Sequence, residues 1–232
     1  MSDTLANALV WYGVFLFATT CHEAAHAATA QALGDPTAYR GGQVTLSPLP
    51  HIRREPIGTV VVPLLSLLMG GQLIGWASTP FDPEWADRHP RRAAIMAVAG
   101  PAANLTLLLL AGLLLRGGME LGWFGVPRRL SSTGLAVAPD GALTWVVTVL
   151  SVCFSLNLLL AVLNLLPVPP LDGASAIALV LPESLARGYR TMLRTSPYVA
   201  LLGLYLAWQV IRPLNHAAFQ SAVSLLWFPH LG

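Results

Sequence analysis

The chain has 232 residues, of which 55% are hydrophobic and only 10% are charged, and its formal net charge is +2. Soluble domains carry about 25% charged residues, so this composition excludes an ordinary water-soluble protein. Every basic residue is an arginine, which excludes Schiff-base chemistry and a Ser/Lys catalytic dyad. The arginines do not alternate with aromatic residues on a polar face, so nucleic-acid binding has no support.

Long stretches without Asp, Glu, Lys or Arg predict membrane helices. They cover residues 4–21, 57–81, 93–115, 141–171 and 195–211. A spanning helix needs about 20 mainly apolar residues, so each stretch is long enough to hold one. We therefore expect an all-α membrane protein with about five to six membrane segments. The first segment is preceded by Asp3 and by no basic residue, unlike a signal peptide, and we expect residues 5–32 to remain as a helix.

The segments that follow are predicted from their breakers and their periodicity. The first helix should stop at the Gly-Asp-Pro sequence of residues 34–36. Alternating apolar and polar residues at 44–47 predict a short membrane-associated strand. Residues 57–77 are apolar but are interrupted by Pro63 and by the glycine pair 70–71, and a polar linker follows at 78–92.

The second half of the chain is predicted to be helical apart from its proline-rich and polar loops. Helices are expected at about 93–115 and 142–166, and another should run from Gly173 toward Arg194. Residues 197–212 should span the membrane, whereas residues 214–228 either span it or lie on its surface.

A five-residue motif near the end of the first helix carries the strongest chemical signal. Residues 22–26 are His-Glu-Ala-Ala-His, a pattern expected by chance only about 0.003 times in a chain of this composition. His22 and His26 project from one helix face, and two imidazoles so placed suit tetrahedral Zn²⁺ with one position left for water. Glu23 lies beside them, where its carboxylate can act on that water as a general base.

A third zinc ligand has to come from elsewhere in the chain, and Asp172 is the candidate. It follows a long apolar run that ends in Pro167, Pro169 and Pro170. Each proline removes an amide donor and breaks the helix, and broken backbone at membrane depth is tolerated where it is buried in protein or lines a cavity. Two histidines and one carboxylate form a catalytic zinc set. The alternative is that Asp172 caps a helix at the interface.

Three motifs together resemble the site-2 protease family of intramembrane metalloproteases. They are the motif His22–His26, the sequence Gly100–Asn104 at the start of a later helix, and the segment from Asn164 through the prolines to Gly173. The resemblance covers most of residues 15–175. Larger members of the family add peptide-binding or nucleotide-sensing modules, so the chain is similar to the minimal branch. We expect one domain over residues 1–232, with a catalytic core at about 5–175 and C-terminal membrane helices at about 176–232.

The resemblance implies a zinc metalloendopeptidase that hydrolyses peptide bonds of membrane-spanning protein substrates. It implies one Zn²⁺ per chain, bound by His22, His26 and Asp172, with Glu23 as the general base. It also implies that Asn164 lies near the metal and helps to hold substrate or oxyanion. The strand that follows the first motif helix is expected to receive an unwound substrate segment.

Two polar residues keep two interpretations each. Asn104 either contacts the substrate or oxyanion or forms an ordinary hydrogen bond between helices. His51, which follows the predicted strand, either touches the site or belongs to a surface loop.

The zinc ligands must lie at one depth, which constrains the topology. If residues 57–81 spanned fully, three crossings would place Asp172 on the wrong face, so residues 57–77 are predicted to be re-entrant. The predicted loops on the active-site face then hold nine arginines and those on the opposite face four. The nine are Arg40, Arg53, Arg54, Arg88, Arg91, Arg92, Arg187, Arg190 and Arg194. This excess predicts a cytoplasmic active site with the N-terminus outside. We expect the protein in a bacterial or archaeal cell membrane, in contact with membrane lipid.

Three alternatives to a zinc protease are less consistent with the sequence. A metal transporter can also place His and Asp in a membrane, but it does not need Glu23 between the two histidines. A catalytically inactive scaffold would typically have lost one of the four residues. A serine intramembrane protease needs a Gly-x-Ser-Gly type of nucleophile site, which the sequence lacks.

Overall fold

The computed structural model describes residues 2–69, 73–139, 141–195 and 197–227. Within these ranges the regular elements are helices, and four of them are long: α1 (Ser2–Ala32), α6 (Pro90–Glu120), α7 (Gly141–Asn164) and α10 (Pro197–Trp227). The shorter elements are α2 (Thr37–Arg40), α3 (Pro48–Arg54), the π-helix η1 (Ile57–Val61), α4 (Val62–Leu68), α5 (Pro83–Arg88), α8 (Asp172–Ala176), the 3₁₀-helix η2 (Ile177–Leu179) and α9 (Glu183–Thr195).

Three helices within the described residues are long and apolar enough to cross a membrane. They are Leu5–Ala32, Pro90–Glu120 and Leu143–Asn164. The surface of α6 supports a lipid environment, because Leu109, Leu110, Leu113 and Leu114 are each more than half exposed. Apolar side chains clustered on one face of a helix have no favourable contact with water, so these observations fit an integral membrane protein.

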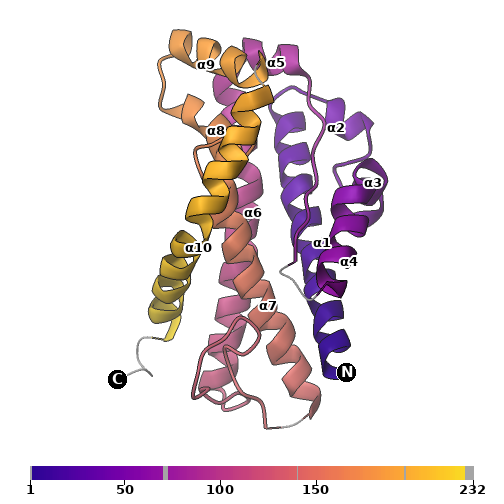
Figure 1. The fold of residues 1–232 in the computed structure, drawn as a ribbon, viewed down its shortest axis with the longest axis vertical. Helices are drawn as coiled ribbons and strands as arrows, with labels where there is room; N and C mark the ends of the chain where they lie inside the picture. Colours follow the sequence, from indigo (N-terminus) through magenta and orange to yellow (C-terminus); the bar gives the residue numbers. More distant parts are fainter. Residues whose placement is uncertain (1, 70–72, 140, 196, 228–232) are drawn as a thin grey trace.

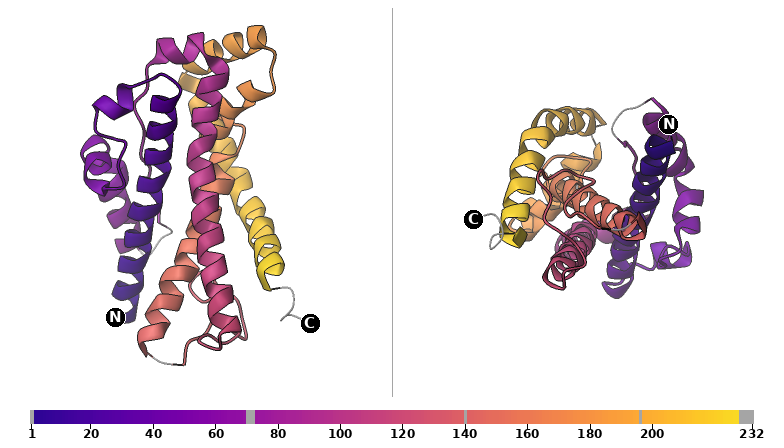
Figure 2. Two further views of the ribbon diagram at one scale, coloured as in Figure 1. Left: turned by 180° about the vertical axis from the view of Figure 1, so that it is seen from behind. Right: turned by 90° about the horizontal axis from the view of Figure 1, so that it is seen from below.

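The three candidate spans form the centre of the molecule, with α6 packed against both α1 and α7 (Figure 1). Small residues such as Ala30 and Ala93 let α1 and α6 approach closely near the ends of both helices. A larger apolar core joins α6 and α7 to α10 and to the loop between α6 and α7, with Leu115 and Phe154 fully buried in it. α10 lies on the side of α6 and α7 that faces away from α1 (Figure 2).

The path of residues 57–82 is decisive for the site. The chain runs through η1 and α4 along part of α1 and returns as residues 73–81, here called the extended segment, to α5 (Figure 1). The amide of Trp76 donates to the carbonyl oxygen of Gly58 at 3.0 Å. A methyl group at Gly75 would collide with Phe15 and Pro63, so glycine allows the extended segment to lie against α1 and α4. The glycine pair 70–71, the predicted turning point, lies outside the described residues.

The strand predicted at residues 44–47 is wrong. The backbone bends at Val44, Thr45 and Leu46, and no described segment pairs with it. Side chains hold the bend, because the Ser47 amide donates to Thr45 Oγ1 at 3.1 Å and the Thr45 carbonyl oxygen lies 3.1 Å from His51 Nε2. A strand needs a partner for its backbone groups, and here local hydrogen bonds take that place.

Three other expectations need correction. The helix expected from Gly173 toward Arg194 is divided into α8, η2 and α9. The two segments expected at 197–212 and 214–228 form one helix, α10, with Pro213 inside it, and Phe228 lies outside the described residues. Pro101 lies inside α6 rather than at a helix start. The helices predicted at 5–32, 93–115 and 142–166 are confirmed as α1, α6 and α7, with ends that differ by a few residues.

Candidate metal centre

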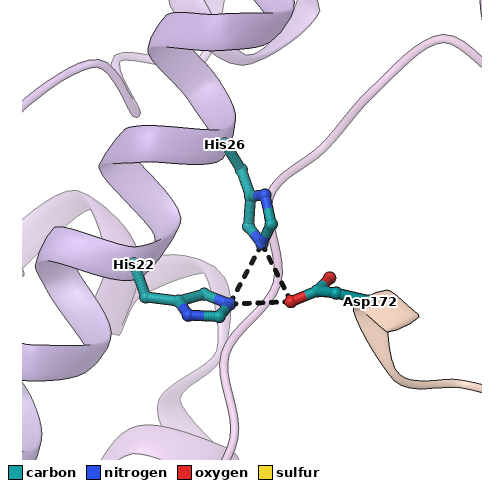
Figure 3. A group of neighbouring side chains, drawn as sticks. All are labelled: His22, His26 and Asp172. Atoms are coloured by element: carbon teal, nitrogen blue, oxygen red, sulfur yellow. Dashed lines mark hydrogen bonds and ion pairs between the residues drawn. The ribbon is translucent and has the colours of Figure 1, made fainter. Parts of the chain in front are cut away.

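His22, His26 and Asp172 come together in the wall of one cavity (Figure 3). Both imidazoles project from the same face of α1, and Asp172 approaches them from the start of α8. The two Nε2 atoms lie 3.0 Å apart, and Asp172 Oδ2 lies 3.1 Å from His22 Nε2 and 3.3 Å from His26 Nε2. The sequence predicted this meeting of residues 150 positions apart, and the structure places the three side chains in contact.

The spacing of the three atoms fits a tetrahedral zinc site. Zinc binds imidazole nitrogen and carboxylate oxygen at about 2.0–2.2 Å, so neighbouring ligand atoms in a tetrahedron are separated by about 3.3 Å. The three distances within this group lie close to that value. Three ligand atoms would form one face of such a tetrahedron and would leave the fourth position for water or substrate, as in catalytic zinc sites.

Hydrogen bonds behind the ligands define which nitrogen of each histidine carries the proton. His26 Nδ1 lies 2.7 Å from the carbonyl oxygen of Met96, which can only accept, so His26 Nδ1 is the donor. His22 Nδ1 lies 2.6 Å from Asn104 Oδ1. In the neutral rings, both Nε2 atoms therefore present a lone pair to the centre of the site.

The orientation of Asn104 is itself fixed by a chain of buried amides. Asn104 Nδ2 donates to Asn157 Oδ1 at 2.8 Å, and Asn157 Nδ2 donates to the carbonyl oxygen of Cys153 at 2.8 Å. Because that last group can only accept, each amide in the chain has one possible orientation, and Asn104 Oδ1 must face His22. Asn104 and Asn157 are fully buried, and the chain links α1, α6 and α7.

With both rings neutral, the site brings together three atoms that each present a lone pair. Asp172 Oδ2 contacts Nε2 of both histidines. Such an arrangement of acceptors is repulsive unless a cation lies among them. The residues present therefore fit a divalent metal ion, and the set of two neutral imidazoles and one carboxylate is a catalytic zinc set.

Gly100 forms the wall of the site that comes from α6. A methyl group built on Gly100 would collide with Nε2 of both His22 and His26. Every other amino acid would therefore place an atom where the ligands need space. The sequence singled out Gly100 only as part of the motif with Pro101, and the structure gives it a reason.

Glu23 lies one residue after the first histidine, buried and in the wall of the same cavity. Its carboxylate accepts a hydrogen bond from the Thr79 hydroxyl, with Thr79 Oγ1 2.6 Å from Glu23 Oε2. Thr79 belongs to the extended segment, so the carboxylate is held by a part of the chain that is 56 residues away. No feature of the sequence singled out Thr79.

The cavity in front of the site has a volume of about 830 Å³ and a mostly apolar lining. The extended segment provides one wall and the end of α7 another, with Leu160, Leu163 and Asn164. A cavity of this size accommodates a few residues of an apolar peptide chain.

The structure places the three other polar candidates in different surroundings. Asn164 lines the cavity, and its Nδ2 donates to the carbonyl oxygen of Leu160 at 3.1 Å. Asn104 does not line the cavity and lies behind His22 as a link between helices. His51 is buried beside the bend at Thr45 and lies neither at the metal centre nor on the surface.

Sequence reasoning missed several residues at the site besides Thr79. Asn157 carried a signal, because it is a second asparagine in a long apolar run, seven residues before Asn164. Arg190 of α9 lies in the cavity wall, 3.6 Å from Asp87. The carbonyl group of Met96 is a backbone contact that side-chain patterns do not reveal.

Curated proteins match most of the chain. It is 31% identical over 214 residues to "Putative zinc metalloprotease YwhC" of Bacillus subtilis, covering 89% of the chain and 85% of that relative. It is 30% identical over 183 residues to "Putative zinc metalloprotease Rip2" of Mycolicibacterium smegmatis, covering 76% of the chain and 61% of the relative. Rip2 of Mycobacterium tuberculosis is 30% identical over 176 residues, covering 73% of the chain and 59% of the relative. The chain thus spans about three fifths of each Rip2 protein.

No family model matches the chain, and no solved structure matches it. The helical fold, the ligand set and the curated relatives define the class as a membrane zinc metalloprotease. Within that class, the identity to YwhC over most of both chains shows that the chain belongs to the site-2 protease family.

Proposed function

We propose that the chain is an intramembrane metalloendopeptidase that hydrolyses peptide bonds of membrane-spanning proteins, with one zinc ion bound by His22, His26 and Asp172. The observation that carries this proposal is the convergence of two imidazole Nε2 atoms and one carboxylate oxygen within 3.3 Å of one another. The site opens into an apolar cavity between candidate membrane helices, which suits a hydrophobic peptide segment.

The chemistry is divided between the metal and Glu23. When bound, zinc supplies Lewis-acid polarisation of the scissile carbonyl group and lowers the pKa of water at the site toward about 7. Glu23 takes the proton of the attacking water and delivers it to the leaving amine. Its place beside His22 and in the cavity wall supports this role. Asn164, which lines another wall of the cavity, donates to the substrate carbonyl group or to the oxyanion in this proposal.

A helical substrate hides its carbonyl groups in its own hydrogen bonds, so a segment of it must unwind before cleavage. The strand expected to receive it after the first motif helix is not formed, so we assign this role to the extended segment. Trp76 N–H and the Ser78 carbonyl group bond toward η1 and α3, and backbone groups alternate sides along an extended chain. Ala77 then presents its N–H and C=O to the opposite edge, where they have no partner among the described residues.

The return of the extended segment to α5 supports a re-entrant path for residues 57–77. α4 runs beside part of α1, and the extended segment leads from there back to α5. The Asp172 carboxylate meets the two histidines, as a re-entrant path requires. The nine arginines of the predicted active-site face support a site near the cytoplasmic side.

The test compares the wild-type chain with the variant Glu23→Gln in detergent, using a panel of single-span substrates and zinc analysis. We expect the variant to keep its zinc and to lose cleavage, because the amide cannot accept the proton of water. A metal transporter would keep its function in this variant. Unchanged cleavage by Glu23→Gln, or a wild-type chain that binds zinc but cleaves no substrate of the panel, contradicts the proposal.

A further inference from the structure

The hydrogen bond between Thr79 and Glu23 is the contact that the proposed reaction leaves unexplained. Thr79 Oγ1 lies 2.6 Å from Glu23 Oε2 and 2.9 Å from the carbonyl oxygen of Glu23. Both side chains are buried, with 9% of Thr79 and 5% of Glu23 exposed. A hydroxyl group has one proton to donate, so the two contacts are not equal.

The proton of Thr79 belongs on the bond to the carboxylate. The Glu23 carbonyl group lies within α1, where the helix already supplies a donor, whereas the carboxylate can only accept when it is ionised. A distance of 2.6 Å lies in the range of bonds between a hydroxyl group and an anionic oxygen. The bond occupies Oε2 and leaves Oε1 for the reaction.

The position of the Thr79 hydroxyl is set by contacts on either side of it. At the preceding residue, Ser78 Oγ donates to Glu55 Oε1 at 2.6 Å and Arg54 Nε donates to the Ser78 carbonyl group at 3.0 Å. At the end of the segment, the Asp82 amide donates to Asp35 Oδ2 at 2.8 Å. The extended segment is thus tied to α3 and to the end of α1, and Thr79 is held in register between these ties.

We propose that Thr79 is a positioning residue for the general base and that its hydroxyl group fixes the rotamer of Glu23 that serves the reaction. This inference rests on the proposed function. It adds a link between substrate and base, because Thr79 lies on the same segment whose free edge receives the substrate. Pairing of a substrate with residues 75–79 then also steadies the hydroxyl group that orients Glu23.

The experiment measures kcat, KM and zinc content for Thr79→Val, Thr79→Ala and Thr79→Ser. Valine has the shape of threonine without the hydroxyl donor, and serine keeps the donor. Alanine also removes the donor and serves as the second variant if valine prevents folding. Thr106→Val is the matched control, because its hydroxyl group bonds within α6 to the carbonyl oxygen of Ala102, away from the cavity.

We expect kcat of Thr79→Val to fall about 10- to 100-fold, with KM within about 2-fold of the wild-type value and zinc content unchanged, because a disordered base mainly slows the chemical step. Thr79→Ala should behave similarly, and Thr79→Ser should recover kcat to within about 3-fold of wild type. The control should match wild type.

Three results would overturn the inference. One is an unchanged or increased kcat in Thr79→Val. Another is a serine variant as slow as the valine variant, since shape and not the hydroxyl group would then matter. The third is a loss of zinc that accounts for the loss of rate. Failure of the proposed function would appear as unchanged cleavage by Glu23→Gln. The three results above apply to an enzyme in which Glu23→Gln has been shown to be inactive, so the two failures are distinguishable.

Discussion

The two histidines proposed as ligands depend on neighbours that would contribute no atom to the metal. Met96 and Asn104 place the ring protons on Nδ1, and Asn157 fixes the orientation of Asn104. Partners behind a ligand of this kind commonly contribute about 10- to 100-fold to metal affinity. Asn104 thus forms a bond between helices, as one of the two interpretations expected, and it lies behind His22 rather than in the cavity where a substrate or oxyanion would bind.

The close approach of Gly100 to His22 and His26 can be tested by adding a single methyl group. Gly100→Ala should lose most of its zinc, because the added methyl group collides with Nε2 of His22 and His26. Metal analysis after purification measures the loss. Gly117→Ala is the control, since nothing lies within 4 Å of a methyl group at that position of the same helix. Full zinc content in Gly100→Ala would show that the histidines do not bind metal against this wall.

The extended segment carries the edge proposed to pair with substrate, and substitutions along that edge test the pairing. Ala77→Pro removes the N–H at the centre of that edge and should slow cleavage at least about 10-fold without releasing zinc. Val44→Pro is the matched control, because the bend at 44–46 does not line the cavity. Equal rates for Ala77→Pro and wild type would contradict pairing at the extended segment.

Asp35 ties the end of the extended segment to the end of α1, and its carboxylate makes that tie depend on pH. Burial alone would raise the pKa of Asp35, but hydrogen bonds from Thr37 and from the Asp82 amide lower it below its ordinary value. A lowered pKa in the folded state contributes stability above the unfolded-state pKa of about 3.9, and this stability is lost as pH falls through the folded-state pKa.

Thermal unfolding of Asp35→Asn in detergent measures this contribution. At pH 7 the variant should be less stable than wild type by about 1.5–3 kcal/mol, the usual contribution of hydrogen bonds to a charged group. The difference should shrink when both proteins are measured near pH 3. A difference that does not change between the two pH values would show that the carboxylate charge is not responsible.

The helices and the meeting of the three side chains could be predicted because their signals are local or paired with strong breakers. The apolar runs define α1, α6 and α7, the spacing of His22 and His26 places both rings on one helix face, and the prolines before Asp172 mark a break at depth. The alternation at 44–47 misled, because a period of two over four residues also fits a bend held by Thr45. Thr79 gave no signal, since its role exists only through a contact between distant segments.

The short helices and the arginines are distributed unequally between the two ends of the molecule. α2, α5 and α9 lie at one end, and the N-terminus and the loop between α6 and α7 lie at the other (Figure 1). If the first end is cytoplasmic, Ser184 of α9 faces the cytoplasm and Ser132 of the α6–α7 loop faces outward; both are exposed.

Cysteine labelling tests this orientation. In a background with Cys21 and Cys153 replaced by alanine, a maleimide that cannot cross the membrane should label Ser132→Cys in intact cells. It should label Ser184→Cys only after the cells are opened. The reverse pattern would contradict a cytoplasmic active site and would leave the ligand set unaffected.

Metal analysis of the purified protein tests whether a carboxylate late in the chain completes a zinc site with two imidazoles of the first helix. We predict one zinc per wild-type chain, a strongly reduced content in Asp172→Ala, and wild-type content in Glu84→Ala, where an exposed carboxylate is removed. A wild-type chain without zinc, or an Asp172→Ala variant that keeps its full zinc content, would contradict the account.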